Sequence, residues 1–256
     1  MSPDGMLLEE KVAVITGGAS GIGRATALLF ASHGAHVIVG DVNESGGEET
    51  VEDIKKDGSS AHFFRTDVSR AEEMQHLMDA SSRAAGGIDV IVNNAGLQYA
   101  GVVTEFEEPR WDALMQVNAK SCFLSAKYGV PHLRARGGGS IVCNSSLGGI
   151  RGGAGLTAYS ASKGAIVAFT KALAQEVAGD GIRVNCVAPG WIDTPFNQPA
   201  IDFMGGRKNQ DEMVQQKVPM QRQGNPKEVA NVILFLASDA SSYMTAQALI
   251  ISGGSY

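Results

Sequence analysis

Tyr159 and Lys163 are the two side chains in this sequence whose types and spacing could support proton transfer. Small and apolar residues recur around them at intervals of three and four, which predicts a helix over 157–178 with both side chains on one face. A free tyrosine has a pKa of about 10, and a nearby cation lowers that pKa toward the pH at which acid–base catalysis is efficient. The spacing therefore predicts a general acid/base tyrosine with a lysine partner. Taken alone, the same spacing also fits a core tyrosine beside a solvated lysine.

A glycine-rich turn follows the first apolar segment, residues 11–16, and precedes a segment of helical periodicity. Its glycines are Gly17, Gly21 and Gly23, in the spacing Gly-x-x-x-Gly-x-Gly rather than the more common Gly-x-Gly-x-x-Gly. In a strand–turn–helix unit such glycines let the backbone approach a pyrophosphate, whose charge faces the helix N-terminus. This turn therefore predicts a dinucleotide site.

Asp41 directly follows the second predicted strand, residues 35–40, and stands 18 residues beyond Gly23. A carboxylate at this distance accepts hydrogen bonds from the adenosine ribose hydroxyls and repels a 2′-phosphate. Gly18, Ala19 and Val42 offer no basic side chain that would offset the repulsion. We therefore predict NAD as the cofactor in preference to NADP. The alternative is that Asp41 only begins the next helix.

Alternating strands and helices run through the whole chain and predict an α/β fold. We expect a single domain over 1–256, a Rossmann-type doubly wound parallel sheet of about seven strands with helices on both faces. Asn118 lies inside a long predicted helix, 108–135, where it indicates a kink or a polar task because Asn is a poor helix former. Residues 195–222 are rich in Pro and Gly and are expected to be irregular, which predicts a substrate-binding loop over about 191–222.

Composition narrows the class of protein further. The 256 residues carry a net charge of −6 with no long run of one sign, which argues against nucleic acid as the main partner. The histidines are scattered and the three cysteines, Cys122, Cys143 and Cys186, lack metal-ligand spacing, so no metal is expected. No apolar run reaches the length of a membrane span, and the first ten residues do not resemble a signal peptide. We therefore expect a cytoplasmic protein with reduced thiols.

Taken together, the motifs resemble those of the short-chain dehydrogenase/reductase family, in its single-domain branch. The resemblance extends from Lys11 to Gly254 and is carried by Gly17-x-x-x-Gly21-x-Gly23, Asn93-Asn-Ala-Gly96, Asn118, Ser146, Tyr159-x-x-x-Lys163 and Pro189-Gly190. Each motif is modest alone, but their common order and spacing are specific. The final turn departs from the pattern, with Ser252 where the family often has Asp.

The resemblance implies a role for each matching position. Tyr159 would be the general acid/base, Lys163 would lower its pKa and bind the nicotinamide ribose, Ser146 would hydrogen-bond the reacting oxygen, and Asn118 would hold a water in a proton relay. Ser146 is preferred to Ser145 because it stands 13 residues before Tyr159. The other implied cofactor contacts are Gly17, Ser20, Gly21, Ile22 and Gly23 at the pyrophosphate, Asp41 at the ribose, Asp67 and Val68 at the adenine, Asn94, Ala95 and Gly96 in the groove, and Pro189, Gly190, Ile192 and Thr194 at the nicotinamide.

The function so implied is an NAD(H)-dependent oxidoreductase that interconverts a secondary alcohol and a ketone on a small or medium-sized substrate. One alternative is a 3-ketoacyl-thioester reductase acting on acyl-carrier-protein or CoA substrates with NADPH, against which Asp41 and Asp180 argue. Asp180 stands where those reductases often carry Arg or Lys for an acidic protein partner. A second alternative is a non-catalytic NAD-binding sensor, although Ser146, Tyr159 and Lys163 are all intact.

The substrate itself is not predicted by the sequence, nor are the direction of reaction and its stereospecificity. Candidates for the pocket wall are largely apolar: Gln98, Tyr99, Leu147, Ile150, Trp191, Phe196 and residues within 197–215. Arg151 and Arg207 would suit an anionic substrate, or are solvated loop charges.

The resemblance also implies a homotetramer, in which two long helices pair between subunits and the last strand forms a second contact. Helices 108–135 and 157–178 offer large apolar residues, Trp111 and Phe123 among them, and small ones such as Ala165. The tail 250–256 ends in an aromatic residue that suits the second contact. Internal packing of all these residues in a monomer is the alternative.

Overall fold

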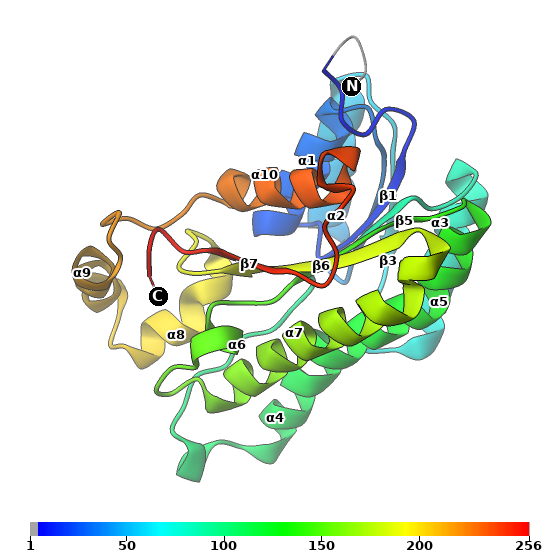
Figure 1. Ribbon diagram of the computed structural model, residues 1–256. Coiled ribbons are helices and arrows are strands. Elements are labelled where there is room, and N and C mark those ends of the chain that lie inside the picture. The colour runs from blue at the N-terminus through cyan, green and yellow to red at the C-terminus, as the bar shows by residue number, and fades with distance from the viewer. Residues whose placement is uncertain (1–4, 256) are drawn as a thin grey trace.

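Seven short segments rich in Val, Ile and Ala pair as parallel strands at the centre of the protein (Figure 1). The structure is a computed structural model that describes residues 5–255, so Tyr256 of the predicted second contact lies outside the described residues. The strand order is β3-β2-β1-β4-β5-β6-β7. The strands are β1 (Val12–Thr16), β2 (His36–Asp41), β3 (Ala61–Arg65), β4 (Val90–Asn93), β5 (Gly139–Asn144), β6 (Ile182–Pro189) and β7 (Ala248–Ile251). The predicted α/β class and seven-stranded parallel sheet are confirmed.

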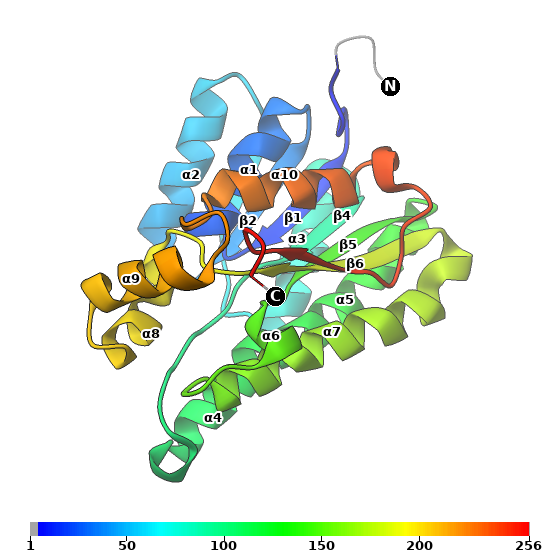
Figure 2. The same cartoon turned by 60° about the vertical axis from the view of Figure 1, so that its left-hand side comes forward.

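Every residue of the central strands β1 and β4 is buried, because helices cover both faces of the sheet. One apolar cluster joins the sheet to α1 (Gly21–Ser32), α2 (Glu44–Lys56) and α10 (Pro226–Ala237). A second cluster joins the other face to α3 (Ala71–Ala85), α5 (Ser121–Ala135) and α7 (Thr157–Val177). Figure 2 shows these two helical layers on either side of the strands. Continuous apolar strands are therefore a consequence of burial on both sides.

The long predicted helix 108–135 is interrupted at the residue that suggested a kink. It consists of α4 (Glu108–Leu114), a π-helical segment η2 (Met115–Lys120) and α5, with Asn118 inside the π-helical segment. A π-helical turn displaces the helical ladder locally, and such turns occur often at functional sites. The expectation of a local irregularity at Asn118 is therefore confirmed.

The segment expected to be irregular, 195–222, contains two helices, so that expectation was wrong in part. They are α8 (Gln198–Phe203) and α9 (Arg207–Lys217), preceded by a 3₁₀ turn at Pro195–Asn197. Ala200, Ile201 and Val214 are buried, and this tertiary burial stabilises helices whose sequence is otherwise polar. Figure 2 shows both helices at one end of the sheet, outside the two covering layers.

Four further short helical segments complete the described chain: α6 (Gly148–Arg151) and the 3₁₀ turns Val103–Glu105, Ala178–Asp180 and Asp239–Ser241. The three cysteines are free and buried, as expected. No helix within residues 5–255 is both long and apolar enough to cross a membrane.

The strand order reverses between β1 and β4, which lie side by side although two other strands separate them in sequence. Helices leave these two strands toward opposite faces, so the carboxyl ends of the central strands open onto a crevice. In open parallel sheets, ligands bind at such a switch point. The residues with predicted roles at the ends of β1, β2, β4, β5 and β6 therefore meet at one edge of the sheet.

Candidate active site

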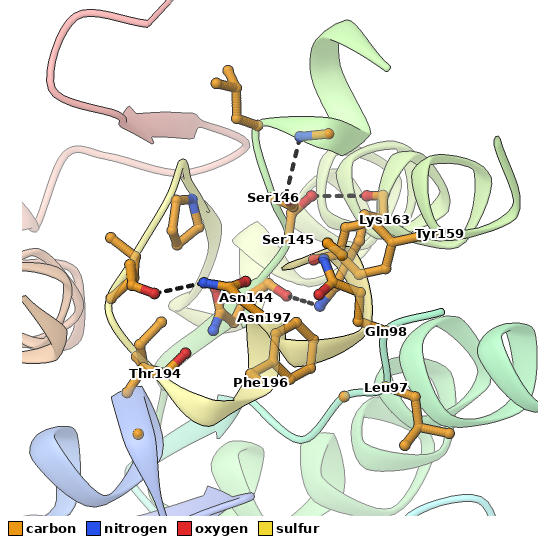
Figure 3. Close-up of a pocket in the computed structure, with 18 of the residues that line it drawn as sticks. Leu97, Gln98, Asn144, Ser145, Ser146, Tyr159, Lys163, Thr194, Phe196 and Asn197 are labelled. Carbon is orange, nitrogen blue, oxygen red and sulfur yellow. Dashed lines mark hydrogen bonds between the residues drawn. The ribbon is translucent and has the colours of Figure 1, made fainter. Parts of the chain in front are cut away.

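Tyr159 and Lys163 lie on one face of α7, one turn apart, as the spacing predicts. Both are almost fully buried, with 5% and 3% of their surfaces exposed. The Lys163 Nζ donates a hydrogen bond to the main-chain carbonyl of Asn144, 2.8 Å away at the end of β5. It stands 5.9 Å from the centroid of the Tyr159 ring. The two side chains that the sequence singles out therefore project from α7 toward the end of β5 (Figure 3).

The expected lowering of the tyrosine pKa is not present in this structure. Burial raises the pKa of Tyr159 to about 12, and a hydrogen bond with Ser146 offsets this only in part. Burial also lowers the pKa of Lys163, to about 8. The prediction was wrong because desolvation, which sequence spacing does not report, dominates the pKa of this phenol. Tyr159 is consequently protonated across the ordinary pH range, which is the form that can donate a proton to a ketone.

Ser146, rather than Ser145, is the serine whose hydroxyl neighbours the Tyr159 phenol. Its Oγ accepts a hydrogen bond of 3.1 Å from the Gly148 N–H at the start of α6, which leaves its own proton free to donate. The Ser145 hydroxyl instead donates to the main-chain carbonyl of Lys163 at 2.8 Å. The structure therefore gives the two adjacent serines different tasks, and Ser145 fixes β5 against α7.

Asn118 lies behind the crevice wall, with its side-chain amide occupied by three hydrogen bonds. Its Oδ1 accepts from the Leu97 N–H at 2.7 Å, and its Nδ2 donates to the Leu97 carbonyl at 3.0 Å. Nδ2 also donates to the Ser162 hydroxyl on α7 at 2.9 Å. The polar task indicated by the sequence is thus to fix the loop after β4 against the helix that carries Tyr159.

The glycine turn after β1 is packed so closely that side chains would not fit. A Cβ on Gly17, whose φ is +69°, would lie 2.7 Å from the Ala95 Cα, and a Cβ on Gly23 would lie 2.0 Å from the Gly17 carbonyl oxygen. The side chain of Asn94 holds this turn by donating to the carbonyls of Thr16 and Gly17. Gly23 therefore does not reach the crevice itself but supports the turn that does.

The N-terminus of α1 is well suited to an anion. Ser20 makes no capping hydrogen bond with its side chain, and the first turn contains no acidic residue. The first N–H groups of a helix lack intrahelical partners, and the helix dipole favours negative charge there. The turn therefore fits a pyrophosphate without any further cation.

Asp41 stands at the end of β2 beside that turn. Its carboxylate accepts hydrogen bonds from the N–H groups of Ala19 at 3.0 Å and Asn43 at 2.9 Å. Among the described residues that line this end of the crevice none is basic, so the negative charge of Asp41 is not offset there.

One cavity of about 1050 Å³ joins all these parts. Apart from Gly23 and Asn118, every residue predicted to be catalytic or to bind cofactor lines it, namely Gly17, Ser20, Gly21, Ile22, Asp41, Asp67, Val68, Asn94, Ala95, Gly96, Ser146, Tyr159, Lys163, Pro189, Gly190, Ile192 and Thr194. Thr194 lies across the crevice from the glycine turn, since a Cβ on Gly21 would be 3.3 Å from the Thr194 Cγ2. The cavity, its glycine cradle and the uncapped α1 fit a nicotinamide dinucleotide.

The four substrate candidates Gln98, Leu147, Trp191 and Phe196 also line the cavity, whereas Tyr99 and Ile150 do not. The Tyr99 ring packs with the apolar residues around Leu114 and under Arg110, and Ile150 faces outward with 44% of its surface exposed. Arg207, the first residue of α9, is paired with Asp193 and Asp211, which makes it a surface charge rather than a group that lines the cavity.

Sequence reasoning missed Asn144, the residue whose carbonyl binds Lys163 and whose amide donates to the Asn94 Oδ1 at 2.9 Å. Its position at the end of a buried strand was a signal that could have identified it. The cavity is also lined by Arg151, a predicted candidate for an anionic substrate, and by Lys217, which lies two residues beyond the predicted range 197–215.

Comparisons with known proteins agree with this geometry. A family model described as enoyl-(acyl carrier protein) reductase matches residues 17–256. The 3-oxoacyl-(acyl-carrier-protein) reductase of Thermotoga maritima is 41% identical over 249 residues, which cover 97% of this chain and 99% of that protein. The dehydrogenase/reductase SDR family member 4 of Oryctolagus cuniculus is 36% identical over 248 residues, which cover 96% and 94%. The crystal structure of levodione reductase matches with a TM-score of 0.93 and 33% identity, covering 96% of this chain and 98% of that one.

Proposed function

Since the chain belongs to the short-chain dehydrogenase/reductase family of oxidoreductases, we propose that it interconverts a secondary alcohol and a ketone with NAD(H). The observation that carries the proposal is the buried phenol of Tyr159, which lines the same cavity as Ser146, Lys163 and the glycine turn. The test is oxidation of a panel of secondary alcohols with NAD⁺, and reduction of the matching ketones with NADH, followed at the absorbance of NADH. Absence of hydride transfer in both directions, with NAD⁺ and with NADH, would favour the non-catalytic NAD-binding sensor.

Tyr159 exchanges the proton and Ser146 holds the reacting oxygen. When bound, the nicotinamide accepts or supplies the hydride. In the direction of ketone reduction, the protonated phenol donates its proton to the substrate oxygen, on which negative charge develops. The Ser146 hydroxyl donates a second hydrogen bond to that oxygen, since the bond from the Gly148 N–H occupies only a lone pair of Ser146 and leaves its proton available. The ammonium of Lys163, 5.9 Å from the ring centroid, stabilises the phenolate that results.

Lys163 and Asn118 also act as positioning residues. The Lys163 Nζ is held at the Asn144 carbonyl, where we propose that it also binds the nicotinamide ribose. Three hydrogen bonds hold the amide of Asn118 in place, and we propose that this residue also holds a water of the proton relay. We propose that residues 191–222 bind the substrate, because they supply Trp191, Phe196 and parts of α8 and α9 to the cavity wall.

The proposed cofactor contacts follow the cavity from the glycine turn to β6. The pyrophosphate would be bound by Gly17, Ser20, Gly21 and Ile22 with the N-terminus of α1, and the ribose hydroxyls by Asp41. Asp67 and Val68 would contact the adenine, and Asn94 to Gly96 would form the floor of the groove. Pro189, Gly190, Ile192 and Thr194 would position the nicotinamide.

We expect NAD(H) to be preferred to NADP(H), because the Asp41 carboxylate would repel the 2′-phosphate of NADP(H). Replacement of Asp41 should reduce that preference by about tenfold or more. The measurement is the ratio of kcat/KM for NADH and NADPH. Asp41→Asn removes the charge but keeps an oxygen that can accept from the Ala19 N–H, so it separates cofactor choice from damage to the turn. Asp67→Asn is the matched control, which should weaken both cofactors by the same factor. A wild-type preference for NADPH would contradict the assignment.

A 3-ketoacyl-thioester reductase is the second candidate, which the 41% identity to the Thermotoga maritima reductase favours. Two observations favour the simple alcohol instead. Asp41 disfavours NADPH, and Asp180 accepts a hydrogen bond of 2.8 Å from the Arg134 Nε, which neutralises a cation that an acidic carrier protein would otherwise meet. Reduction of acetoacetyl-CoA with NADPH faster than any simple ketone with NADH would establish this second candidate.

We also propose a homotetramer. Trp111 on α4 and Phe123 on α5 remain 41% and 51% exposed, whereas Leu114 and Leu124 are buried within the subunit. Exposed aromatic side chains on two consecutive helices are typical of a subunit contact. Light scattering at micromolar concentration should give a mass about four times the 26.8 kDa of one chain. The mass of a single chain would refute the proposal, and a dimer would retain only one of the two contacts.

A further inference from the structure

Gln98 has a side-chain amide without a partner inside the proposed active site. The residue is only 8% exposed, and it lines the cavity together with Ser146 and Tyr159. Its Oε1 is fully buried and makes no hydrogen bond within residues 5–255. Figure 3 shows this side chain beside those of Tyr159 and Lys163.

The backbone fixes Gln98 in that position. The preceding residue, Leu97, is held at both its N–H and its carbonyl by the side chain of Asn118. Asn118 is in turn anchored to Ser162, on the helix that carries Tyr159. The hydrogen bonds of Asn118 therefore fix the backbone next to Gln98 relative to α7, the helix that carries Tyr159.

Gln98 makes no hydrogen bond with Tyr159 or Lys163, and apolar side chains also line this cavity. Leu97, Leu147 and Phe196 line the same space and offer no hydrogen-bond donor from their side chains. A buried carbonyl oxygen without a donor is costly, and most such groups in folded proteins are paired. An amide retained here, where an apolar side chain of similar volume would pack without that cost, indicates a hydrogen-bonding ligand.

The reacting oxygen is not that ligand, because Tyr159 and Ser146 provide its two donors. The nicotinamide is assigned to Pro189–Thr194 at the end of β6, on another segment of the cavity wall. Gln98 Oε1 needs a donor, and the donor that an alcohol substrate can supply is a second hydroxyl group.

We propose that Gln98 Oε1 accepts a hydrogen bond from a second hydroxyl of the substrate, so that the substrate class is a diol or hydroxyketone rather than an alcohol with a single oxygen. This inference rests on the proposed function and deepens it. A site that hydrogen-bonds a substrate hydroxyl discriminates strongly against the analogue that lacks it, because the buried amide is then left unpaired.

The experiment compares kcat/KM for cyclohexanol with kcat/KM for the cis and trans isomers of cyclohexane-1,2-, 1,3- and 1,4-diol, all with NAD⁺. We expect the wild type to prefer at least one diol over cyclohexanol by about tenfold or more. Gln98→Met keeps the volume but removes the amide, and it should lower that diol-to-cyclohexanol ratio by about the same factor. Leu97→Met is the matched control at the neighbouring position and should change both values of kcat/KM by a common factor. Gln98→Asn, which keeps an amide on a shorter side chain, should give an intermediate ratio.

The outcomes are distinct. A wild-type enzyme that oxidises cyclohexanol as well as every diol would overturn the inference while leaving the proposed function intact. An unchanged ratio in Gln98→Met would do the same, because a merely structural glutamine would lower both rates together. If Gln98→Met fails to fold, the wild-type preference and the Gln98→Asn ratio decide the question. Failure to oxidise any of these alcohols would contradict the proposed function and this inference with it.

Discussion

Replacing Tyr159 with Phe should lower kcat by about 10²-fold or more, the contribution typical of a general acid. Binding of NADH should stay close to the wild-type value, since the substitution removes one oxygen and leaves the ring to pack against Phe196, whose centroid is 6.3 Å away. The loss is large because Ser146 can donate a hydrogen bond to the substrate oxygen but is a poor proton donor for it. Steady-state kinetics and fluorescence titration of NADH measure the two quantities separately.

Tyr99→Phe is the matched control for that experiment. It removes the same hydroxyl from a tyrosine that lies outside the cavity wall, so it should keep most of the wild-type kcat. Retention of more than about a tenth of wild-type kcat by Tyr159→Phe would show that the general-acid role is wrong. A loss of NADH binding as large as the loss of kcat would indicate instead that the hydroxyl holds the site together.

Replacing Lys163 with Ala should damage both turnover and cofactor binding. The Lys163 side chain is 3% exposed, and its Nζ bridges α7 to the Asn144 carbonyl. Its removal takes away the cation that stabilises the Tyr159 phenolate and the proposed donor to the nicotinamide ribose. We expect kcat to fall by about 10²-fold and the Kd for NADH to rise by about tenfold, the loss of one charge-assisted hydrogen bond.

Two further variants sharpen the Lys163 result. Lys163→Met keeps most of the buried volume and removes the charge, so it separates the loss of the cation from the effect of a cavity in the core. Lys171→Ala removes an exposed lysine from the same helix and should have little effect on either quantity. Wild-type affinity for NADH in both Lys163 variants would contradict the ribose contact, even if turnover is lost.

Several features of the site are local in sequence, and these were predictable. A spacing of four on a helix places Tyr159 and Lys163 on one face whatever surrounds that helix. The glycine turn lies between a strand and a helix that are both evident from their periodicity. Asp41 follows a buried strand, and parallel strands bring their carboxyl ends to one edge of the sheet. The α/β fold and these parts of the crevice were therefore predictable from the sequence.

Other features depend on segments that are distant in sequence, and only the tertiary structure decided them. The pKa of Tyr159 is set by burial beneath residues from several elements, so the expected lowering was wrong in direction. The helices α8 and α9 form within a polar, proline-containing segment because Ala200, Ile201 and Val214 are buried against the rest of the chain.

The hydrogen-bond partners of buried side chains also depend on segments that are distant in sequence. The hydrogen bond between Lys163 and Asn144 joins a helix and a strand, so the tertiary structure is needed to identify it. The same is true of the Gln98 Oε1, which has no hydrogen-bond partner among the described residues. Periodicity reports which way a side chain points along its own element. Desolvation and pairing depend on what the other elements bring to it, and no local pattern contains that information.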